Sequence, residues 1–488
     1  MLRAGQTMIM GLALLAVTAC LGQEQYPKAL LHSPTNHPAQ RIIVLSVDGL
    51  HALDLARWVG DQPASALAAL SRRGVTYTNA HLPWDDPAVG MLALSTGGTP
   101  LSTGIMASTF YDRALSPAGS HCEIRGAAVD LLVLPTNVLT QPAKASSLLP
   151  RNPANACKPV TPHEMVNVGN IFELVHAHGG RTAWIGDLPA LVDLYRGPSG
   201  LGLTEAVSFA ASSDNPSTAA AADDRRLDVL LNWIQGKDST GREHPGVPQL
   251  FGMNFTAFAA AQRAPNAGYT DMLATPSPAL RARLQHIDES IGRIVERLRT
   301  EHIFDSTWIV VTATYTQSPM ARRALRHVPV KELHEVLDKY PESTAVYSSS
   351  EGVVMIWLRD PKAADRVARD YAAKARTLGI DEIYTSGRLE LFLEPERSDP
   401  RSPDLLLLPQ TGVIWSKDDN AIAARSGLRD DDTHVALLVS GAQLTGRTDP
   451  TPVPTSQTPA MILRALGMEK LDLPALHREH SPALPGIF

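Results

Sequence analysis

The chain has 488 residues, of which 44% are hydrophobic and 19% are charged, and its net charge is -6. This composition excludes a disordered chain, and the slightly acidic balance gives no reason to expect nucleic-acid binding. The 37 prolines and 34 glycines follow no fixed period, which excludes collagen-like and low-complexity proteins. The length suffices for one large α/β domain or for two to three ordinary domains.

The N-terminal segment has the pattern of an export signal. An apolar run at residues 8–17 is long enough for a signal peptide and too short to span a membrane. The sequence VTAC at residues 17–20 resembles the bacterial lipobox, in which the cysteine is lipidated and becomes the first residue. We therefore expect residues 1–19 to be a lipoprotein-type signal peptide, Cys20 to carry lipid and residues 20–40 to be an extended tether.

Cleavage after residue 19 without lipidation is the alternative, and both routes predict an exported protein, either periplasmic or extracellular. Two further cysteines, Cys122 and Cys157, then remain as a pair in an oxidising compartment. We expect them to form a disulfide, which in the chain-entropy model of a loop this long contributes roughly 3–4 kcal/mol. Two free buried thiols are the alternative.

Strands and helices are expected to alternate along the rest of the chain. Short apolar and β-branched runs predict strands at 41–47, 182–185, 249–255, 307–312, 353–358, 405–408 and 434–439. Helical spacing and end signals predict helices at 170–176, 228–235, 278–303, 361–377 and from 458 to just before 467. The clearest helix is 278–303, whose apolar residues recur every three or four positions.

This alternation predicts an α/β fold with a mostly parallel central sheet and helices on both faces. We expect residues 41–488 to form one large domain, with loop insertions near 113–165 and 197–222. In such sheets ligands bind beyond the carboxyl ends of the strands. Asp48 directly follows the first predicted strand and is therefore expected at a functional position.

Ordered motifs from about residue 41 to the C-terminus carry a family resemblance. They include LSVDGLHALDLARW (45–58), LALSTGGTPLSTGI (92–105), IFELVHAHGGRTAW (171–184), FGMNF (251–255) and DDTHVALLVS (431–440). With them the chain resembles the type I phosphodiesterase/nucleotide pyrophosphatase branch of the alkaline phosphatase superfamily, especially its secreted fungal and bacterial members. The resemblance implies an alkaline-phosphatase-like fold.

The resemblance also implies a hydrolytic reaction. Enzymes of the superfamily hold two divalent metals, usually zinc, about 4 Å apart. A Ser or Thr hydroxyl attacks phosphorus, and about six Asp and His ligands hold the metals. Asp48 matches the first of these ligands.

The position of the nucleophile departs from the family pattern. Aligned from Gly90 backwards, it is occupied by Pro87, and a shift by one residue would place Asp86 or Ala88 there instead. Residues 80–94 contain no Ser, Thr or Cys, so the hydroxyl is missing in every alignment.

Three further positions depart from the family pattern in the same way. By resemblance, Leu188, Tyr315 and Arg425 stand where the family has histidine. One carboxylate cannot hold Zn²⁺ tightly against water, and a guanidinium repels a metal. We therefore expect no cofactor, and zinc or another divalent metal only if the chain is an enzyme with a rearranged site.

Several side chains are candidates for lining the remaining cleft. Asp48 is either a retained metal ligand or a residue that stabilises the turn after its strand. Asp85 and Asp86 form either a functional carboxylate pair, with Asp86 as a possible substitute nucleophile, or helix caps. Asp187, Tyr315 and Arg425 complete the set, and we expect Arg425 to pair with Asp48.

These observations favour a catalytically degenerate relative, a pseudoenzyme that acts as a binding or interaction protein at the cell envelope. One alternative is an active metal-dependent phosphodiester or phosphate-ester hydrolase with a rearranged site. The other is a protein that binds an anionic ligand in the old cleft, with Arg425 as its contact. The expected partners are the membrane, reached through Cys20, and an anionic small molecule or an envelope protein.

Overall fold

The computed structural model describes residues 38–135, 141, 147–210, 215–318, 320, 325–340, 344–350, 352–390, 393, 399–416, 422–425, 427–469 and 471–488. The predicted signal peptide, Cys20 and nearly all of the predicted tether lie outside these residues, so their prediction stays open. Within the described part, no helix combines the length and apolar character that a bilayer crossing requires.

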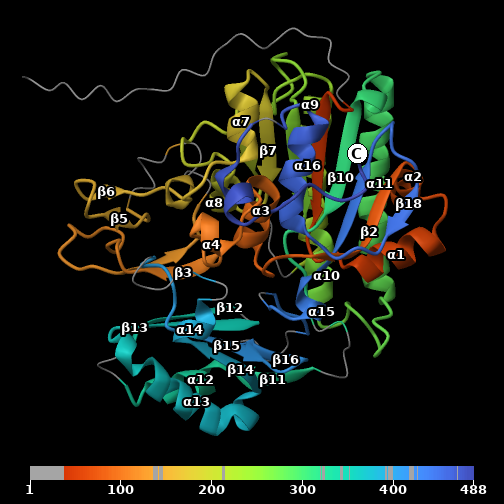
Figure 1. Cartoon of the computed structure of the whole chain (residues 1–488). Coiled ribbons are helices and arrows are strands. Elements are labelled where there is room, and N and C mark those ends of the chain that lie inside the picture. Colours follow the sequence, from red (N-terminus) through yellow and green to blue (C-terminus); the bar gives the residue numbers. More distant parts are fainter. Residues whose placement is uncertain are drawn as a thin grey trace, which may run out of the picture. The chain divides into compact units, whose positions relative to one another are not determined.

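The main sheet is mixed and mostly parallel (Figure 1). Its strands, in spatial order, are β18 (Arg447–Asp449), β2 (Gly74–His81), β17 (His434–Ser440), β10 (Thr307–Thr312), β1 (Arg41–Val47), β9 (Leu250–Phe255), β7 (Thr182–Gly186) and β8 (Glu205–Ser208), and β19 (Val453–Pro454) also pairs with β2. All neighbours from β10 to β8 run parallel, whereas β17 is antiparallel to both of its neighbours. The predicted α/β architecture is confirmed.

The register of the central strands positions the site. The side chains of β1 after Arg41 are buried, as expected for a parallel strand covered on both faces. Ser46 of β1 lies opposite Thr312 of β10 and Asn254 of β9. The residues that follow these three strands therefore meet at one edge of the sheet.

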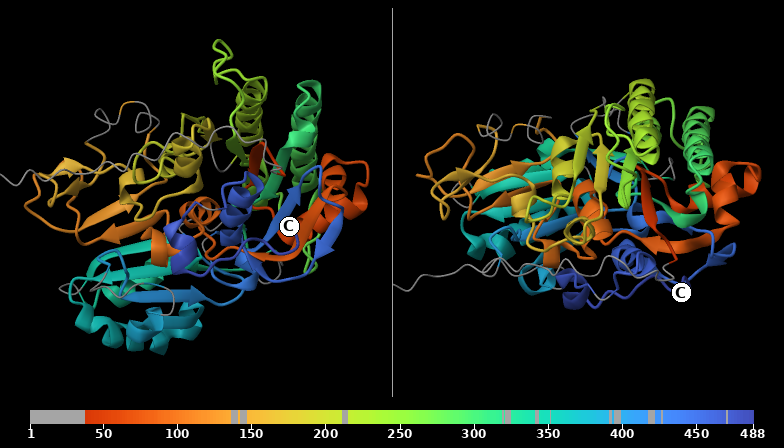
Figure 2. Two further views of the ribbon diagram at one scale, coloured as in Figure 1. Left: turned by 45° about the horizontal axis from the view of Figure 1, so that its top comes forward. Right: turned by 90° about the horizontal axis from the view of Figure 1, so that it is seen from above.

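Two layers of helices cover the sheet. One layer contains α1 (Ala52–Asp61), α2 (Ala66–Ser71), α9 (Pro216–Ile234), α10 (Ala257–Arg263) and α11 (Pro278–Thr300), which contact one another. The other contains α3 (Pro87–Thr96), α4 (Pro100–Thr103), α7 (Ile171–Ala177), α8 (Pro189–Leu194), α16 (Thr458–Ala465) and α17 (Pro474–Arg478). Figure 2 shows α9 and α11 side by side on one face and α16 on the other. The predicted apolar stripe of α11 is buried.

A second, smaller sheet is antiparallel. It consists of β12 (Thr344–Ser350), β13 (Val353–Leu358), β15 (Leu405–Pro409) and β14 (Ile380–Thr385), accompanied by α12 (Val330–Leu337), α13 (Ala364–Leu378) and the parallel pair β11 (Arg326–Pro329) and β16 (Val413–Ser416). Alternate residues of β13 belong to two hydrophobic clusters, one around the main sheet and one packed against α12 and α13.

The strands predicted at 353–358 and 405–408 are therefore real but lie outside the parallel sheet. The sequence could not distinguish these two strands from those of the main sheet. An antiparallel strand that is buried on both faces has the same continuous apolar run as a parallel strand. The remaining short elements are α14 (Ser386–Leu389), α15 (Asp430–Thr433), and the 3₁₀ turns η1 (His163–Met165), η2 (Phe304–Ser306), η4 (Pro361–Ala363) and η5 (Thr455–Gln457).

The two predicted loop insertions have different outcomes. The segment 197–222 is not an insertion, because it contributes β8 to the main sheet and the beginning of α9. Its strand escaped prediction because four residues with two apolar side chains give a weak signal. The described part of the segment 113–165 contains short elements: β4 (Ala127–Asp130), which pairs with β3 (Thr109–Asp112), the pair β5 (Arg151–Asn152) and β6 (Lys158–Pro159), and η1.

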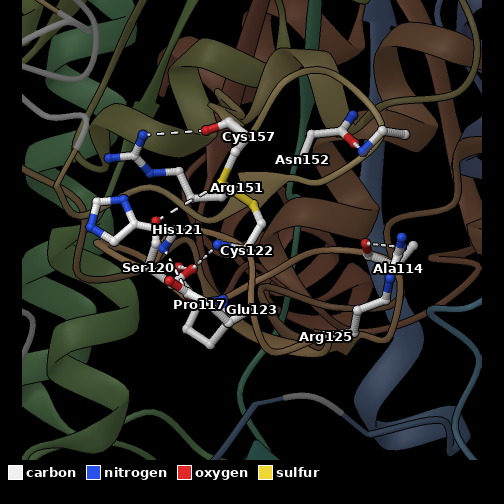
Figure 3. Close-up of a disulfide and its surroundings, with 11 residues drawn as sticks. Ala114, Pro117, Ser120, His121, Cys122, Glu123, Arg125, Arg151, Asn152 and Cys157 are labelled. Carbon is white, nitrogen blue, oxygen red and sulfur yellow. Dashed lines mark hydrogen bonds between the residues drawn. A yellow bond between two sulfur atoms is a disulfide. The ribbon is translucent and has the colours of Figure 1, made fainter.

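The predicted disulfide is present in this second segment (Figure 3). Cys122 and Cys157 are bonded, and their Cα atoms are 6.0 Å apart. Around the bond, Cys157 N donates to Asn152 O and Arg151 Nη1 donates to Cys157 O. The disulfide thus fixes a segment that has little regular structure of its own.

Candidate functional site

A cavity of about 320 Å³ lies at the carboxyl-end edge of the main sheet. Its polar lining comes from the ends of four neighbouring strands: Asp48 follows β1, Asp187 follows β7, Asn254 belongs to β9, and Tyr315 follows β10. The edge predicted for function therefore carries the cavity, as in other parallel sheets.

Asp48, Asn254 and Asp187 form one hydrogen-bonded group in this cavity. The Nδ2 amide of Asn254 donates to Asp48 Oδ2 at 2.8 Å and to Asp187 Oδ1 at 2.9 Å. Ser46 Oγ donates to the other oxygen of Asp48 at 3.0 Å, and Thr314 Oγ1 lies 3.5 Å from the same oxygen. A neutral N–H₂ group thus occupies the space between two carboxyl groups.

The electrostatics of Asp48 follow from this geometry. Its side chain is buried, and burial together with the nearby charge of Asp187 raises the pKa of Asp48 well above its usual range. The hydrogen bonds from Asn254 and Ser46 act in the opposite direction. Asp48 therefore has a strong tendency to hold a proton unless a cation is bound beside it.

Pro87, which the sequence analysis aligned with the nucleophile of the family, is the first residue of α3 and lines the cavity. The proline ring carries no hydroxyl and no N–H, so it cannot attack phosphorus or hold a metal. Asp86 is the N-cap residue of the same helix, because its side chain accepts from the backbone N–H groups of Ala88 and Val89.

Asp85 and Asp86 do not line the cavity, which corrects their prediction as cleft candidates. Asp86 also accepts hydrogen bonds from Ser108 N and Oγ, both at 2.9 Å, so its oxygens are engaged in holding two segments together. Burial raises the pKa of Asp86. Asp85 accepts from the backbone N–H of Thr316 at 2.6 Å. The capping alternative is confirmed for Asp86, and its possible role as a substitute nucleophile stays a prediction.

Tyr315 and Arg425 also line the cavity. The guanidinium carbon of Arg425 lies 5.7 Å from the centre of the Tyr315 ring. Burial and the charge of Asp48 raise the pKa of Tyr315 well above its usual range, while Arg425 lowers it. The expected pair between Arg425 and Asp48 is not formed, because the carboxyl group of Asp48 bonds to Ser46 and Asn254 instead.

Five polar lining residues were missed by the sequence analysis: Asn254, Thr256, Arg263 at the end of α10, Thr314 and Gln317. Asn254 lay within the motif FGMNF, which supported the family resemblance without suggesting a role for this residue. The placement of Asn254 and Gln317 depends on the pairing of β9 and on the loop after β10. No spacing rule in the sequence reports either feature.

The donor set does not fit a two-metal centre. Among the described residues, the cavity is lined by two carboxylates and by no histidine. Across the described ranges, no group of three or more His, Cys, Asp and Glu side chains is arranged to hold a metal ion. Zinc sites of the superfamily type need about three protein ligands for each ion, drawn from imidazole and carboxylate groups. The residues present therefore cannot reproduce the family centre.

The fold defines the class of this protein. The structure is similar to mouse ectonucleotide pyrophosphatase/phosphodiesterase 5 (TM-score 0.59, 14% identity, 89% of this chain and 96% of that chain), one form of which is an inactive variant in complex with AMP. It is also similar to the human protein of the same name (TM-score 0.57, 14% identity, 91% and 96%). The wild-type alkaline phosphatase PafA matches as well (TM-score 0.60, 12% identity, 89% and 97%). The fold is that of the alkaline phosphatase superfamily.

The sequence identifies the family within that class. The model of the type I phosphodiesterase/nucleotide pyrophosphatase family matches residues 42–427. The chain belongs to this family. None of the curated protein sequences compared with it matches.

Proposed function

We propose that this protein is a family member without metal-dependent hydrolysis, which binds a small anionic ligand in the cavity and acts at the cell envelope. The observation that carries the proposal is the amide of Asn254, which bonds to Asp48 and Asp187 at once. In a two-metal enzyme, carboxylates in this place face cations. Here a neutral group from the chain itself takes that position.

The second support is the absence of a hydroxyl at the start of α3. Without a nucleophile that a metal can activate, the covalent step of the superfamily reaction has no attacking atom. The neighbouring Asp86 is a poor substitute nucleophile, because its carboxylate oxygens accept hydrogen bonds from Ala88 N at the start of α3 and from Ser108. The hydroxyl groups of Thr256 and Thr314 line the cavity, but they follow β9 and β10 and do not belong to α3.

Anion binding is supported by the two arginines that line the cavity, Arg263 and Arg425. A guanidinium pairs well with a carboxylate or a phosphate, and such pairs strengthen when water is excluded. AMP is a suitable first probe because a mouse relative has been observed in complex with it. The proposal does not require AMP to be the natural ligand.

Isothermal titration with AMP, combined with chromatography of the mixture, tests this function. We expect saturable binding, unchanged AMP, and affinity that falls about tenfold in Arg425→Ala, the size of one charged hydrogen bond. Arg293→Ala, on the exposed side of α11, is the matched control and should bind like the wild type. Release of adenosine and phosphate at a steady rate would overturn the proposal.

A hydrolase with a rearranged site is the second candidate, favoured by the closeness of Asp48 and Asp187. If it is correct, an activated phosphodiester such as bis(4-nitrophenyl) phosphate is cleaved in the presence of a divalent metal. Asp48→Asn then abolishes the cleavage. If neither AMP nor this diester interacts with the protein, the interaction role remains, and a pull-down from envelope extract would test it.

The proposed location at the envelope rests on the lipobox-like sequence before Cys20 and is supported by the disulfide between Cys122 and Cys157. Disulfides persist mainly in oxidising compartments. In a bacterial host, the full chain should fractionate with membranes and Cys20→Ser should be released in soluble form. Equal membrane association of both would count against lipid anchoring.

A further inference from the structure

The cavity is lined by charged side chains of both signs. Asp48 and Asp187 share the amide of Asn254, and no Lys, Arg or His of the described residues forms an ion pair with either of them. Arg263 and Arg425 line the same cavity. Two like charges held side by side in a partly buried site are costly unless a cation compensates them.

The Tyr315 hydroxyl is influenced by the negative and by the positive side chains of the cavity. Burial is the main cause that raises the pKa of the Tyr315 hydroxyl; the charges of Asp48 and Asp187 raise it further, and those of Arg425 and Arg263 lower it. The side chain of Tyr315 thus lies within electrostatic reach of all four groups. A ligand beside it would meet negative charge on one part of the wall and positive charge on another.

Gln317 supplies an independent sign of a missing ligand. Its side chain is 1% exposed and lines the cavity. Within the described residues, neither its Oε1 nor its Nε2 has a hydrogen-bond partner. An unsatisfied buried polar group costs about 1–3 kcal/mol, so an amide with both ends unpaired needs a partner that offers a donor and an acceptor together.

We propose that the ligand of this cavity is a small zwitterion, in which a short apolar skeleton carries a primary ammonium and an anionic group. The ammonium lies beside Asp48 and Asp187 without displacing the amide of Asn254, and the anionic group faces the two arginines. Gln317 joins both ends, since its Oε1 accepts from the ammonium and its Nε2 donates to the anionic group. This inference rests on the proposed function and narrows the ligand it binds.

The rest of the wall agrees with a small organic zwitterion rather than with a free inorganic ion. Met91, Leu191, Val192 and Trp184 line the cavity together with the polar groups. An apolar skeleton buries surface against them, which contributes roughly 25 cal/mol for each Å² removed from water. An inorganic ion gains nothing from these side chains.

Titration calorimetry with three matched probes tests the inference on the full chain at pH 7. L-Leucine carries both charges, 4-methylpentanoate lacks the ammonium, and 3-methylbutylamine lacks the carboxylate. We expect leucine to bind at least about tenfold more tightly than either single-charge probe, because each charged hydrogen bond is worth that much. Equal affinity for leucine and 4-methylpentanoate would overturn the inference.

O-Phosphoethanolamine extends the series to a phosphate as the anionic group. Tighter binding of this probe than of leucine assigns a phosphate to the arginines, and the reverse order assigns a carboxylate. Both orders support a zwitterion. If AMP binds without turnover but neither leucine nor O-phosphoethanolamine binds more tightly than 4-methylpentanoate and 3-methylbutylamine, the inference fails and the proposed function stands. If AMP is cleaved, the proposed function fails.

Asp187→Asn separates the ammonium contact from general damage to the cavity. We expect leucine to bind about tenfold more weakly to this variant, while the affinity for 4-methylpentanoate does not fall. Asp305→Asn is the matched control, since its carboxylate is 82% exposed and pairs with Arg73 at the surface. Equal weakening of both probes in Asp187→Asn, with an unchanged melting temperature, would contradict an ammonium site.

Discussion

At the scale of single residues, the site is determined by which groups face one another. Two carboxyl groups and one amide meet at the end of β1, β7 and β9, and the amide holds the place between the carboxyls. The position of Asp48 could be predicted, because the residue after a central parallel strand lies at the functional edge. The bridge made by Asn254 could not, because it requires the register of β9 against β1.

The buried carboxyl group of Asp48 predicts a pH dependence of stability. Burial and Asp187 raise the pKa of Asp48 in the folded state above its value of about 3.8 in the unfolded chain. Its contribution to stability is therefore fully present below that value and is lost as the pH rises through the folded pKa. Asp48→Asn removes this loss, so its unfolding free energy relative to wild type should increase between pH 4 and pH 8.

Urea unfolding at several pH values measures this difference, which grows by about 1.4 kcal/mol for each pKa unit of the shift. The exposed Asp305→Asn is the control and should differ little from wild type at any pH. A constant difference between Asp48→Asn and wild type across this range would show that the carboxyl group is not destabilised in the fold.

Asp86 yields a second prediction at this scale, because it serves the fold. Its carboxylate accepts from Ala88, Val89 and Ser108. Asp86→Ala should lower the unfolding free energy by about 2–4 kcal/mol, the sum expected for a lost cap and a buried charged acceptor. Asp86→Asn keeps one acceptor for the cap and should lose less. An alanine variant as stable as the asparagine variant would contradict this role.

At the scale of elements, periodicity predicted the structure where one helix or strand determines its own pattern. The stripe of α11 and the apolar run of β1 were found as expected. The pattern failed where partners matter: β13 and β15 have the apolar runs of parallel strands but pair antiparallel in a separate sheet. β8 was missed because the edge of a sheet does not demand a long apolar run.

We expect the disulfide between Cys122 and Cys157 to stabilise the segment between β3 and η1. That segment has few regular backbone hydrogen bonds, so closing the loop between Cys122 and Cys157 restricts mainly the unfolded chain. The double variant Cys122→Ser/Cys157→Ser should lose roughly 3–4 kcal/mol of unfolding free energy in urea. A loss below about 1 kcal/mol would mean that the loop-entropy account does not apply to this segment.

At the scale of the whole molecule, the fold matches the family, whereas the side chains of the site are predicted to differ from the family pattern. The family match covers residues 42–427 and the fold neighbours span nearly the whole chain, so the architecture of a phosphoester hydrolase is retained. By the family resemblance, Leu188, Tyr315 and Arg425 are predicted to stand where the family has histidine. A fold of this kind positions strand ends at one edge whatever side chains they carry, so a cavity at this edge does not depend on the catalytic groups of the family.

The most direct test of this account is the metal content of the purified protein. Residues 21–488 are purified from the periplasm, incubated with excess Zn²⁺, desalted and analysed by mass spectrometry for zinc per chain. We expect less than about one tenth of an ion for each chain, because one amide-bridged pair of carboxylates cannot retain zinc against water. Close to two ions per chain, the number of a superfamily centre, would contradict the account and show that the protein is a metal-dependent hydrolase.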